Sequence, residues 1–422
     1  MLLDFSIGNF RSFHGIQTLD FRATGLVSES KDIDQNNIIE KGGQKILKTV
    51  GLYGPNASGK TNLIQALGVF RTLVESSLES EVAMIYSADP FRLSSDDPGH
   101  DGFFQVQLLL EGRKYRYGFT LGDGAVWEEW LFGPAEKNET WYFKRTKEKV
   151  ESNKEWFEEA HSLPIENLRP NTLFLTFASA YNGPTSQAIR GFISNNISFD
   201  NGNSSRRNLN IVIRKDGASS FRQRQPTNVL LKEGKQTLVL DWLKSAGLVY
   251  SDIIFEDHNR DANRVIVEKN ILDKNGNVAG KTFMDLDLAE SAGTRKFYYY
   301  IGILVRLFAE GGLLISDEID NNFHPFLLRQ FVRFFNDPLI NTAGAQLLFT
   351  SHDTNLLDPE ILRRDQIYFA EKSIHDETIL YSLSDLKGIR NNADFARQYL
   401  AGFYGALPVL EKYKSLPADS DQ

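Results

Sequence analysis

The stretch GLYGPNASGKTNLIQAL, residues 51–67, decides the fold of this 422-residue chain. Residues 54–61 fit the pattern G-x-x-x-x-G-K-[ST], a loop whose backbone amides surround phosphate groups. An apolar run precedes the loop at residues 46–53, and a helical pattern follows it over about residues 60 to 77. This succession of strand, loop and helix predicts an α/β fold that is built around a phosphate site.

The loop supplies most of the groups that a nucleotide needs. Its amides and the N-terminus of the next helix would surround the β- and γ-phosphates, and Lys60 would neutralise charge during catalysis. The hydroxyl of Thr61 would ligate magnesium. We therefore expect ATP and Mg²⁺ as cofactors. The residues expected to contact the nucleotide here are Gly54, Pro55, Asn56, Ala57, Ser58, Gly59, Lys60, Thr61 and Asn62.

Two further strands end in residues that suit hydrolysis. GGLLISDEID, residues 311–320, is an apolar strand that ends in adjacent carboxylates, so Asp317 is the predicted metal ligand and Glu318 the predicted catalytic base. AQLLFTSHD, residues 345–353, ends near His352. An imidazole at this position would contact the γ-phosphate or the attacking water.

A second turn suited to phosphate, ESAGT at residues 290–294, begins another helical run. Ser291 offers a hydroxyl, Gly293 allows close backbone approach, and the helix dipole favours anions. Because the chain has one nucleotide-sized loop, we expect this turn to meet a γ-phosphate held by a second copy in a symmetric pair. An ordinary helix cap is the alternative interpretation of the same residues.

Composition excludes several other chemistries. The chain has no cysteine, which rules out disulfides, thiolate nucleophiles and cysteine-ligated zinc. It has no apolar stretch long enough to cross a bilayer, and its N-terminus lacks the features of a signal peptide. The net charge of −8 argues against a protein coated in nucleic acid. We expect a soluble cytoplasmic protein without a membrane partner.

The rest of the pattern predicts the domain organisation. Residues 2–7 and 16–21 alternate like a hairpin, and residues 102–133 read as an antiparallel meander. A charged helical pattern, EKVESNKEWFEEA at residues 148–160, opens a predicted insertion. The expected units are an N-terminal lobe at 1–149, a helical and loop insertion at 150–235, a C-terminal lobe at 236–415 and a frayed tail at 416–422.

The order of these motifs resembles the ABC-type ATPase superfamily, and within it the group of RecF, SMC and OLD proteins. In that group NFRSF (9–13) precedes the phosphate loop, and a segment like DNNFHP (320–325) follows the acidic strand. The resemblance implies an ABC-type head with an antiparallel subdomain, in which Arg11 and Asp320 approach the nucleotide. This sequence departs from transporters in having ESAGT in place of LSGGQ, and its Q-loop glutamine is not identifiable.

More narrowly, the chain is similar to the RloA-like AAA15/AAA21 ATPases of prokaryotic defence, to which the AriA ATPase of the PARIS anti-phage system is similar. Three segments are specific to this resemblance: LLFTSHDTNLLDPEILRRDQIYFAEK (347–372), LYSLSDLKGIR (380–390) and YLAGFYGALP (399–408). It implies a homo-oligomeric ATPase that acts as sensor and scaffold for a separately encoded effector, a Toprim-type or other nuclease. A phage protein would be the trigger.

One segment supports a different function. SSRRNLNIVIRKDGASSFRQR, residues 204–224, is rich in arginine and could neutralise phosphates in a salt-dependent way. A RecF-like DNA-binding ATPase of DNA repair is therefore the alternative hypothesis. A solvated loop and a docking site for an acidic partner are further interpretations of the same residues, and the sequence leaves all three open.

Overall fold

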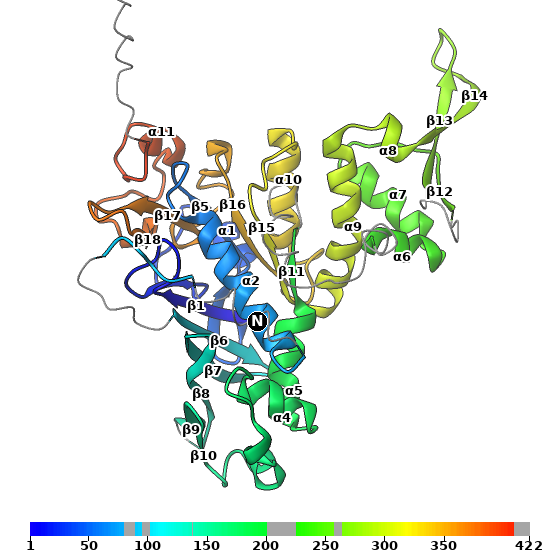
Figure 1. Ribbon diagram of the computed structural model, residues 1–422. Helices are drawn as coiled ribbons and strands as arrows, with labels where there is room; N and C mark the ends of the chain where they lie inside the picture. Colours follow the sequence, from blue (N-terminus) through cyan, green and yellow to red (C-terminus); the bar gives the residue numbers. More distant parts are fainter. Residues whose placement is uncertain (80–88, 95–101, 137, 201–224, 257–263, 409–422) are drawn as a thin grey trace, which may run out of the picture.

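The computed structural model describes residues 1–79, 89–94, 102–136, 138–200, 225–256 and 264–408 (Figure 1). The arginine-rich segment 204–224 and the predicted tail 416–422 lie outside these residues. Within the described chain the strands form four sheets, of six, seven, three and two strands. The two larger sheets and the helices that cover them position the candidate site.

The six-stranded sheet has the order β11-β15-β16-β5-β17-β18 and is parallel except for β18. Its strands are β11 (Ile197–Phe199), β15 (Leu313–Ser316), β16 (Gln346–Thr350), β5 (Thr49–Tyr53), β17 (Ile367–Lys372) and β18 (Thr378–Ser382). β5, β15 and β16 are buried along their whole length, as expected for strands that are covered on both faces. The strands predicted at the phosphate loop, at the acidic end and before His352 are confirmed.

Helices on the two faces of this sheet make two separate cores. α2 (Lys60–Ser76) follows the phosphate loop as predicted, while α9 (Ala292–Glu310) and α10 (Pro325–Asn336) cover the opposite face (Figure 1). Side chains of β15 alternate between the cores, since Leu313 and Ile315 belong to the first and Leu314 to the second. The sheet is thereby fixed from both sides.

The seven-stranded sheet is antiparallel, with the order β10-β9-β8-β7-β6-β1-β2. Its strands are β1 (Leu2–Gly8), β2 (Gln17–Asp20), β6 (Gly102–Leu110), β7 (Arg113–Gly122), β8 (Ala125–Pro134), β9 (Glu139–Thr146) and β10 (Lys149–Ser152). The predicted hairpin and meander are confirmed. The remaining two-stranded sheet pairs β3 (Ile38–Lys41) with β4 (Gln44–Leu47).

Two features of the predicted insertion differ from expectation. The helix predicted over residues 148–160 is wrong, because β10 pairs with β9 there and only a short 3-10 turn, Glu158–Ser162, follows. The alternation of exposed and half-buried residues along β10 suits a strand, and the boundary at residue 149 cuts it. β11 lies within residues 150–235 but pairs with β15, so part of the predicted insertion belongs to the core sheet.

Short helices complete the described chain. They are α1 (Lys31–Asn37), α4 (Phe174–Ala180), α5 (Pro184–Gly191), α6 (Pro226–Lys232), α7 (Gln236–Ser245), α8 (Leu286–Ala289) and α11 (Phe395–Leu400). A π-helical turn, Phe192–Asn196, links α5 to β11. Of the helices in the described ranges, none is long and apolar enough to cross a membrane.

A three-stranded sheet that the sequence pattern did not reveal projects from the α7 side of the molecule (Figure 1). It consists of β12 (Asp252–Glu256), β13 (Arg264–Leu272) and β14 (Val278–Asp285). Its apolar residues divide between two environments: Ile253 and Val267 are buried, whereas Phe283 is 58% exposed. β14 continues through α8 directly to Ser291 at the start of α9.

β1 contains a buried aspartate, Asp4, which is 1% exposed. Its Oδ2 accepts a hydrogen bond from Arg22 Nη2 at 2.9 Å, while Oδ1 has no hydrogen-bond partner among the described residues. Burial raises the pKa of Asp4 from 3.8 to about 6, although the charge of Arg22 opposes the shift. The folded protein therefore favours the protonated form of Asp4 more than the unfolded chain does.

Candidate nucleotide site

The phosphate loop, the acidic strand end and the histidine meet at one edge of the parallel sheet. β16 lies between β5 and β15, and all three strands run in the same direction, so their carboxyl ends are neighbours. A cleft of about 180 Å³ opens there. It is lined by Asn56, Ala57, Ser58, Gly59, Lys60, Thr61, Asn62, Asp317, Glu318 and His352.

The loop holds a conformation that suits phosphate binding. Gly59 has φ 104° and forms the N-cap of α2, so the first amides of the helix lie at the cleft. Ala57 is also left-handed, with φ 63°. A Cβ atom on Gly59 would lie 2.1 Å from Oγ1 of Thr378 in β18, so only glycine fits this position. Thr378 was not singled out from the sequence, because it lies 319 positions after Gly59 (378 minus 59). Only the folded sheet brings it to the loop.

Lys60 lies over the loop that precedes it. Its Nζ donates hydrogen bonds to the carbonyl oxygens of Gly54, at 2.7 Å, and Pro55, at 2.9 Å. Burial lowers the pKa of Lys60, while the nearby carboxylates of Asp317 and Glu318 act to raise it. The cation is thus held at the cleft by weak carbonyl acceptors, which phosphate oxygens of a nucleotide could replace.

One hydroxyl, that of Thr350 at the end of β16, connects the two predicted acidic groups. Thr350 Oγ1 donates to Asp317 Oδ1 at 2.6 Å and accepts from the backbone amide of Glu318 at 2.7 Å. Glu318 adopts a left-handed conformation, with φ 50°. The hydroxyl therefore fixes the metal-side carboxylate relative to the predicted base. Sequence reasoning missed Thr350, although its place two residues before His352 could have indicated it.

The donors in the cleft fit magnesium. Asp317 and Thr61 both line the cleft, and Mg²⁺ in nucleotide sites takes one or two protein oxygens together with phosphates and water. No cluster of three or more histidine, cysteine, aspartate or glutamate side chains within the described ranges could hold a metal alone. With Asp317 and Thr61 as protein ligands, the remaining ligands would come from the nucleotide and water.

His352 follows β16 and Asp320 follows β15, and one hydrogen bond joins the two segments. The backbone amide of His352 donates to Asp320 Oδ1 at 3.3 Å, and the exposed imidazole lines the cleft. Asp320 does not line it. In a single copy its carboxylate contacts the loop after β16, and a nucleotide contact stays a prediction.

The segment 9–13 touches the loop through a different residue from the one predicted. Arg11 has φ 51°, its Nε lies 3.2 Å from Oδ2 of Asp89, and it is not among the residues that line the cleft. Ser12 instead accepts hydrogen bonds at its Oγ from Asn62 Nδ2 and from Thr378 Oγ1, each at 2.8 Å. Ser12 therefore supports the start of α2, and a phosphate contact by Arg11 remains a prediction.

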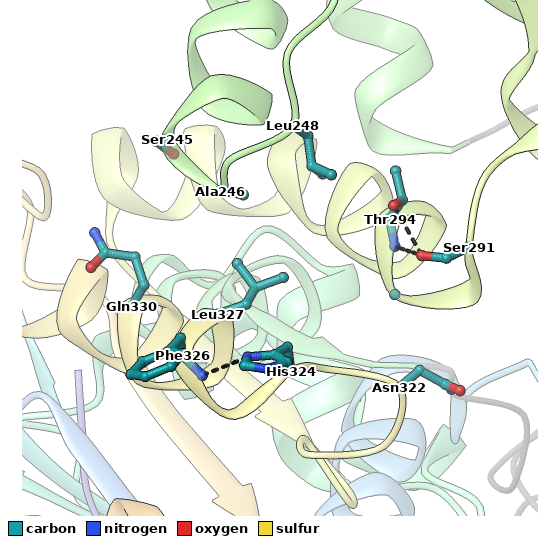
Figure 2. A pocket seen from close by; sticks show the side chains of 11 residues that line it. Ser245, Ala246, Leu248, Ser291, Thr294, Asn322, His324, Phe326, Leu327 and Gln330 are labelled. Carbon is teal, nitrogen blue, oxygen red and sulfur yellow. Dashed lines mark hydrogen bonds between the residues drawn. The ribbon is translucent and has the colours of Figure 1, made fainter.

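The second turn lies in a separate pocket of about 500 Å³, shown in Figure 2. Ser291 is the N-cap of α9, and its Oγ accepts from the amide of Thr294 at 3.1 Å. Gly293, Asn322 and the exposed Phe326 line the same pocket. Within one copy Ser291 is thus an ordinary helix cap, and the two phosphate-suited turns do not share a cleft. Its action on a second copy's nucleotide stays a prediction.

Comparison with known structures finds heads of SMC proteins. The SMC head domain from Thermotoga maritima is 10% identical, with 90% of this chain and 98% of that chain covered and a TM-score of 0.42. An SMC head bound to the C-terminal winged-helix domain of ScpA is 12% identical, with coverages of 90% and 97% and a TM-score of 0.47. The SMC head from Pyrococcus furiosus, bound to the C-terminal domain of ScpA, is 10% identical, with coverages of 96% and 99% and a TM-score of 0.37. No curated protein matches the chain.

A family model matches residues 50–358 and is described as "AAA domain, putative AbiEii toxin, Type IV TA system". The matched region contains the phosphate loop, the turn at Ser291, the acidic strand end and His352. It also spans most of the chain, since 309 of the 422 residues fall within it (358 minus 49). The chain therefore belongs to the AAA_21 family of ATPase domains.

Proposed function

We propose that this protein binds ATP with Mg²⁺ in the cleft and hydrolyses it, in the manner of an ABC-type ATPase. One observation supports this most directly: Lys60, Asp317, Glu318 and His352 come from three different strand ends and line the same small cleft. Such a combination provides a cation, a metal ligand, a base and a hydrogen-bond donor within reach of one triphosphate.

Each side chain has a distinct part in the proposed reaction. Glu318 takes a proton from the attacking water, and His352 donates a hydrogen bond to the γ-phosphate or to that water. Lys60 neutralises charge that develops on the phosphates. Asp317 and Thr61 would hold magnesium, which would supply positive charge to the phosphates when bound. Thr350 holds the carboxylate of Asp317 and the backbone of Glu318 in fixed relative positions.

The site is completed by a second copy in this proposal. Ser291 and Gly293 lie in another pocket of their own chain, yet they begin a 19-residue helix whose N-terminus favours anions. In a two-fold symmetric pair each turn would meet the γ-phosphate bound by the other copy, so that ATP joins the subunits.

The family description supports a biological setting. It names a putative AbiEii toxin and a type IV TA system. We propose that the ATPase acts in the cytoplasm as sensor and scaffold of an antiviral system that resembles PARIS. It would control a separately encoded effector, a nuclease, in response to a phage protein. The RecF-like alternative depends on residues 204–224, which lie outside the described residues.

Hydrolysis is tested by Glu318→Gln, which preserves the shape of the side chain and removes the base. We expect turnover to fall by about 10²- to 10⁴-fold while ATP binding persists, and an ATP-bound assembly should accumulate. Glu310→Gln, an exposed position at the end of α9, is the matched control. Undiminished hydrolysis by the Glu318→Gln variant would remove Glu318 from the role of base.

The composite arrangement is tested by mixing two inactive chains, Lys60→Ala and Ser291→Arg. Random pairing at equal amounts gives heterodimers with one intact site, so about a quarter of wild-type activity should return. Absence of rescue at every mixing ratio would show that the site is built within one chain.

The defence function is tested by expressing the protein with its genomic neighbours and measuring phage plating together with native mass. We expect a stoichiometric second polypeptide and protection from phage that Lys60→Ala abolishes. A chain that purifies alone, pairs only with ATP and binds DNA would support the RecF-like alternative instead.

A further inference from the structure

A lysine of α9 holds the turn that follows the predicted base. Lys296 Nζ donates hydrogen bonds to the carbonyl oxygens of Ile319 and Asn321, both at 3.0 Å. These residues lie one and three positions after Glu318 in the chain. No part of the proposed chemistry assigns a function to Lys296, and its side chain does not line the cleft.

The turn needs such support because its backbone is strained. Glu318 and Asn322 are both left-handed, with φ of 50° and 67°. Non-glycine residues in this region cost about 1–3 kcal/mol each and persist only where the surroundings fix them. Within the turn itself, the amide of Asn321 donates to the carbonyl of Glu318 at 3.0 Å.

The turn is held from two sides. On the β16 side, Thr350 accepts from the amides of Glu318, through its hydroxyl, and of Ile319, through its carbonyl oxygen. On the α9 side, Lys296 donates hydrogen bonds to two carbonyl groups of the turn. Gly293 packs against a third carbonyl, that of Asn322, because a Cβ on Gly293 would lie 2.3 Å from its oxygen. The start of α9 and the turn after Glu318 therefore fit each other closely.

The surroundings of Lys296 favour a charged donor aimed at the turn. Its ammonium lies 4.9 Å from the ring centre of Phe323, a residue of the same turn. Burial lowers the pKa of Lys296, while the carboxylates of Asp200, Asp320 and Glu318 oppose this shift. A neutral residue of similar length would leave the carbonyls of Ile319 and Asn321 without this donor, beside a group of carboxylates.

We infer that Lys296 is a positioning residue that holds Glu318 of its own copy in the orientation for hydrolysis. This inference rests on the proposed function. Ser291, five positions earlier on the same helix, would serve the nucleotide of the other copy. One helix would thus support the base of one site and the phosphate contact of the other.

The first test replaces Lys296 with Met, which keeps the aliphatic stem and removes the donor. Hydrogen–deuterium exchange of residues 317–323 should become faster by about tenfold, while exchange of the loop at 54–62 stays unchanged. The kcat for ATP should fall by at least about tenfold with KM within about twofold, since the phosphate loop is untouched. Lys296→Arg, which can also donate to both carbonyls, should restore most of the kcat.

Lys48→Met is the control, because Lys48 also donates to a backbone carbonyl, that of Asn336 at 3.2 Å, in another part of the fold. Lys48 is buried and Lys296 is half-buried, so loss of Lys48 affects stability at least as much. We expect it to lower Tm without changing kcat below the transition. An equal loss of kcat in both variants would show that Lys296 affects only the stability of the fold, and it would overturn the inference. Unchanged exchange and unchanged kcat in Lys296→Met would do the same.

The second test asks which site Lys296 affects, with the mixed chains described above. In that mixture the Ser291→Arg chain provides Glu318 of the intact site, and the Lys60→Ala chain provides the Ser291 turn. Adding Lys296→Met to the Ser291→Arg chain should remove the rescued activity, whereas adding it to the Lys60→Ala chain should preserve it. The reverse result would overturn the inference. If the wild-type protein hydrolyses no ATP, the proposed function fails. Hydrogen–deuterium exchange of residues 317–323 then still tests whether Lys296 holds the turn after Glu318.

Discussion

Replacing Asp4 with Asn should remove a pH-dependent part of the folding free energy. The carboxylate is buried in β1, and one of its oxygens has no hydrogen-bond partner among the described residues. The substitution keeps the size of the side chain and its acceptor toward Arg22, and it removes the charge that burial disfavours.

The magnitude follows from the pKa of Asp4, which burial raises from 3.8 to about 6. A shift of about two units corresponds to about 3 kcal/mol between the two protonation states. Because the folded pKa is the higher one, protonation of Asp4 stabilises the fold. This stabilisation is fully present below about pH 4 and is lost as the pH rises through about 6.

The measurement is urea unfolding of wild type and Asp4→Asn at several pH values from 4 to 7.5. Wild type should lose about 3 kcal/mol relative to the variant across this range, mostly between pH 4 and 6. Asp32→Asn, at an exposed aspartate in α1, is the matched control. A difference between wild type and Asp4→Asn that stays constant with pH would refute the reasoning.

Two substitutions probe the supports of the cleft. Thr350→Val keeps the shape of the side chain but removes the hydrogen bonds to Asp317 and to the amide of Glu318. In a steady-state assay, kcat should fall by about 10- to 100-fold with ATP affinity retained. Thr350→Ser should recover most of the lost kcat. A Thr350→Val enzyme with normal kcat would contradict this. Gly59→Ala places a Cβ against Thr378, at a position whose backbone φ is 104°. We expect a lower Tm by thermal unfolding and loss of ATP binding by calorimetry. Normal ATP binding would contradict the clash.

Local signals were enough to predict the elements that carry the main motifs. The loop at residues 54–61 combines an apolar strand, a glycine pattern and a helix start within about thirty residues, and the structure has β5 and α2 there. The acidic pair at 317 and 318 follows a short apolar strand, which is β15. Each of these predictions depends on neighbours in the sequence and needs no knowledge of the tertiary fold.

The missed residues depend on contacts between distant parts of the chain. Thr350, Lys296 and Thr378 are unremarkable in sequence, because a threonine at a strand end or a lysine in a helix usually faces solvent. Their importance appears only when β16 is placed between β5 and β15 and when α9 packs beside the turn after Glu318. Residues 148–160 were predicted as a helix because β10 has only four residues, and its alternation is too short to outweigh the charged helical pattern around it.

The projecting sheet has a mechanical consequence for the turn at Ser291. β14 ends at Asp285, which caps α8, and the chain reaches Ser291 six residues later. Lys269 of β13 also forms an ion pair of 2.7 Å with Glu290. The β13–β14 hairpin is therefore joined to Ser291 by a segment of six residues and by an ion pair next to it. A rotation of the hairpin would move Ser291, and a nucleotide that fixes Ser291 would restrict the movement of the hairpin.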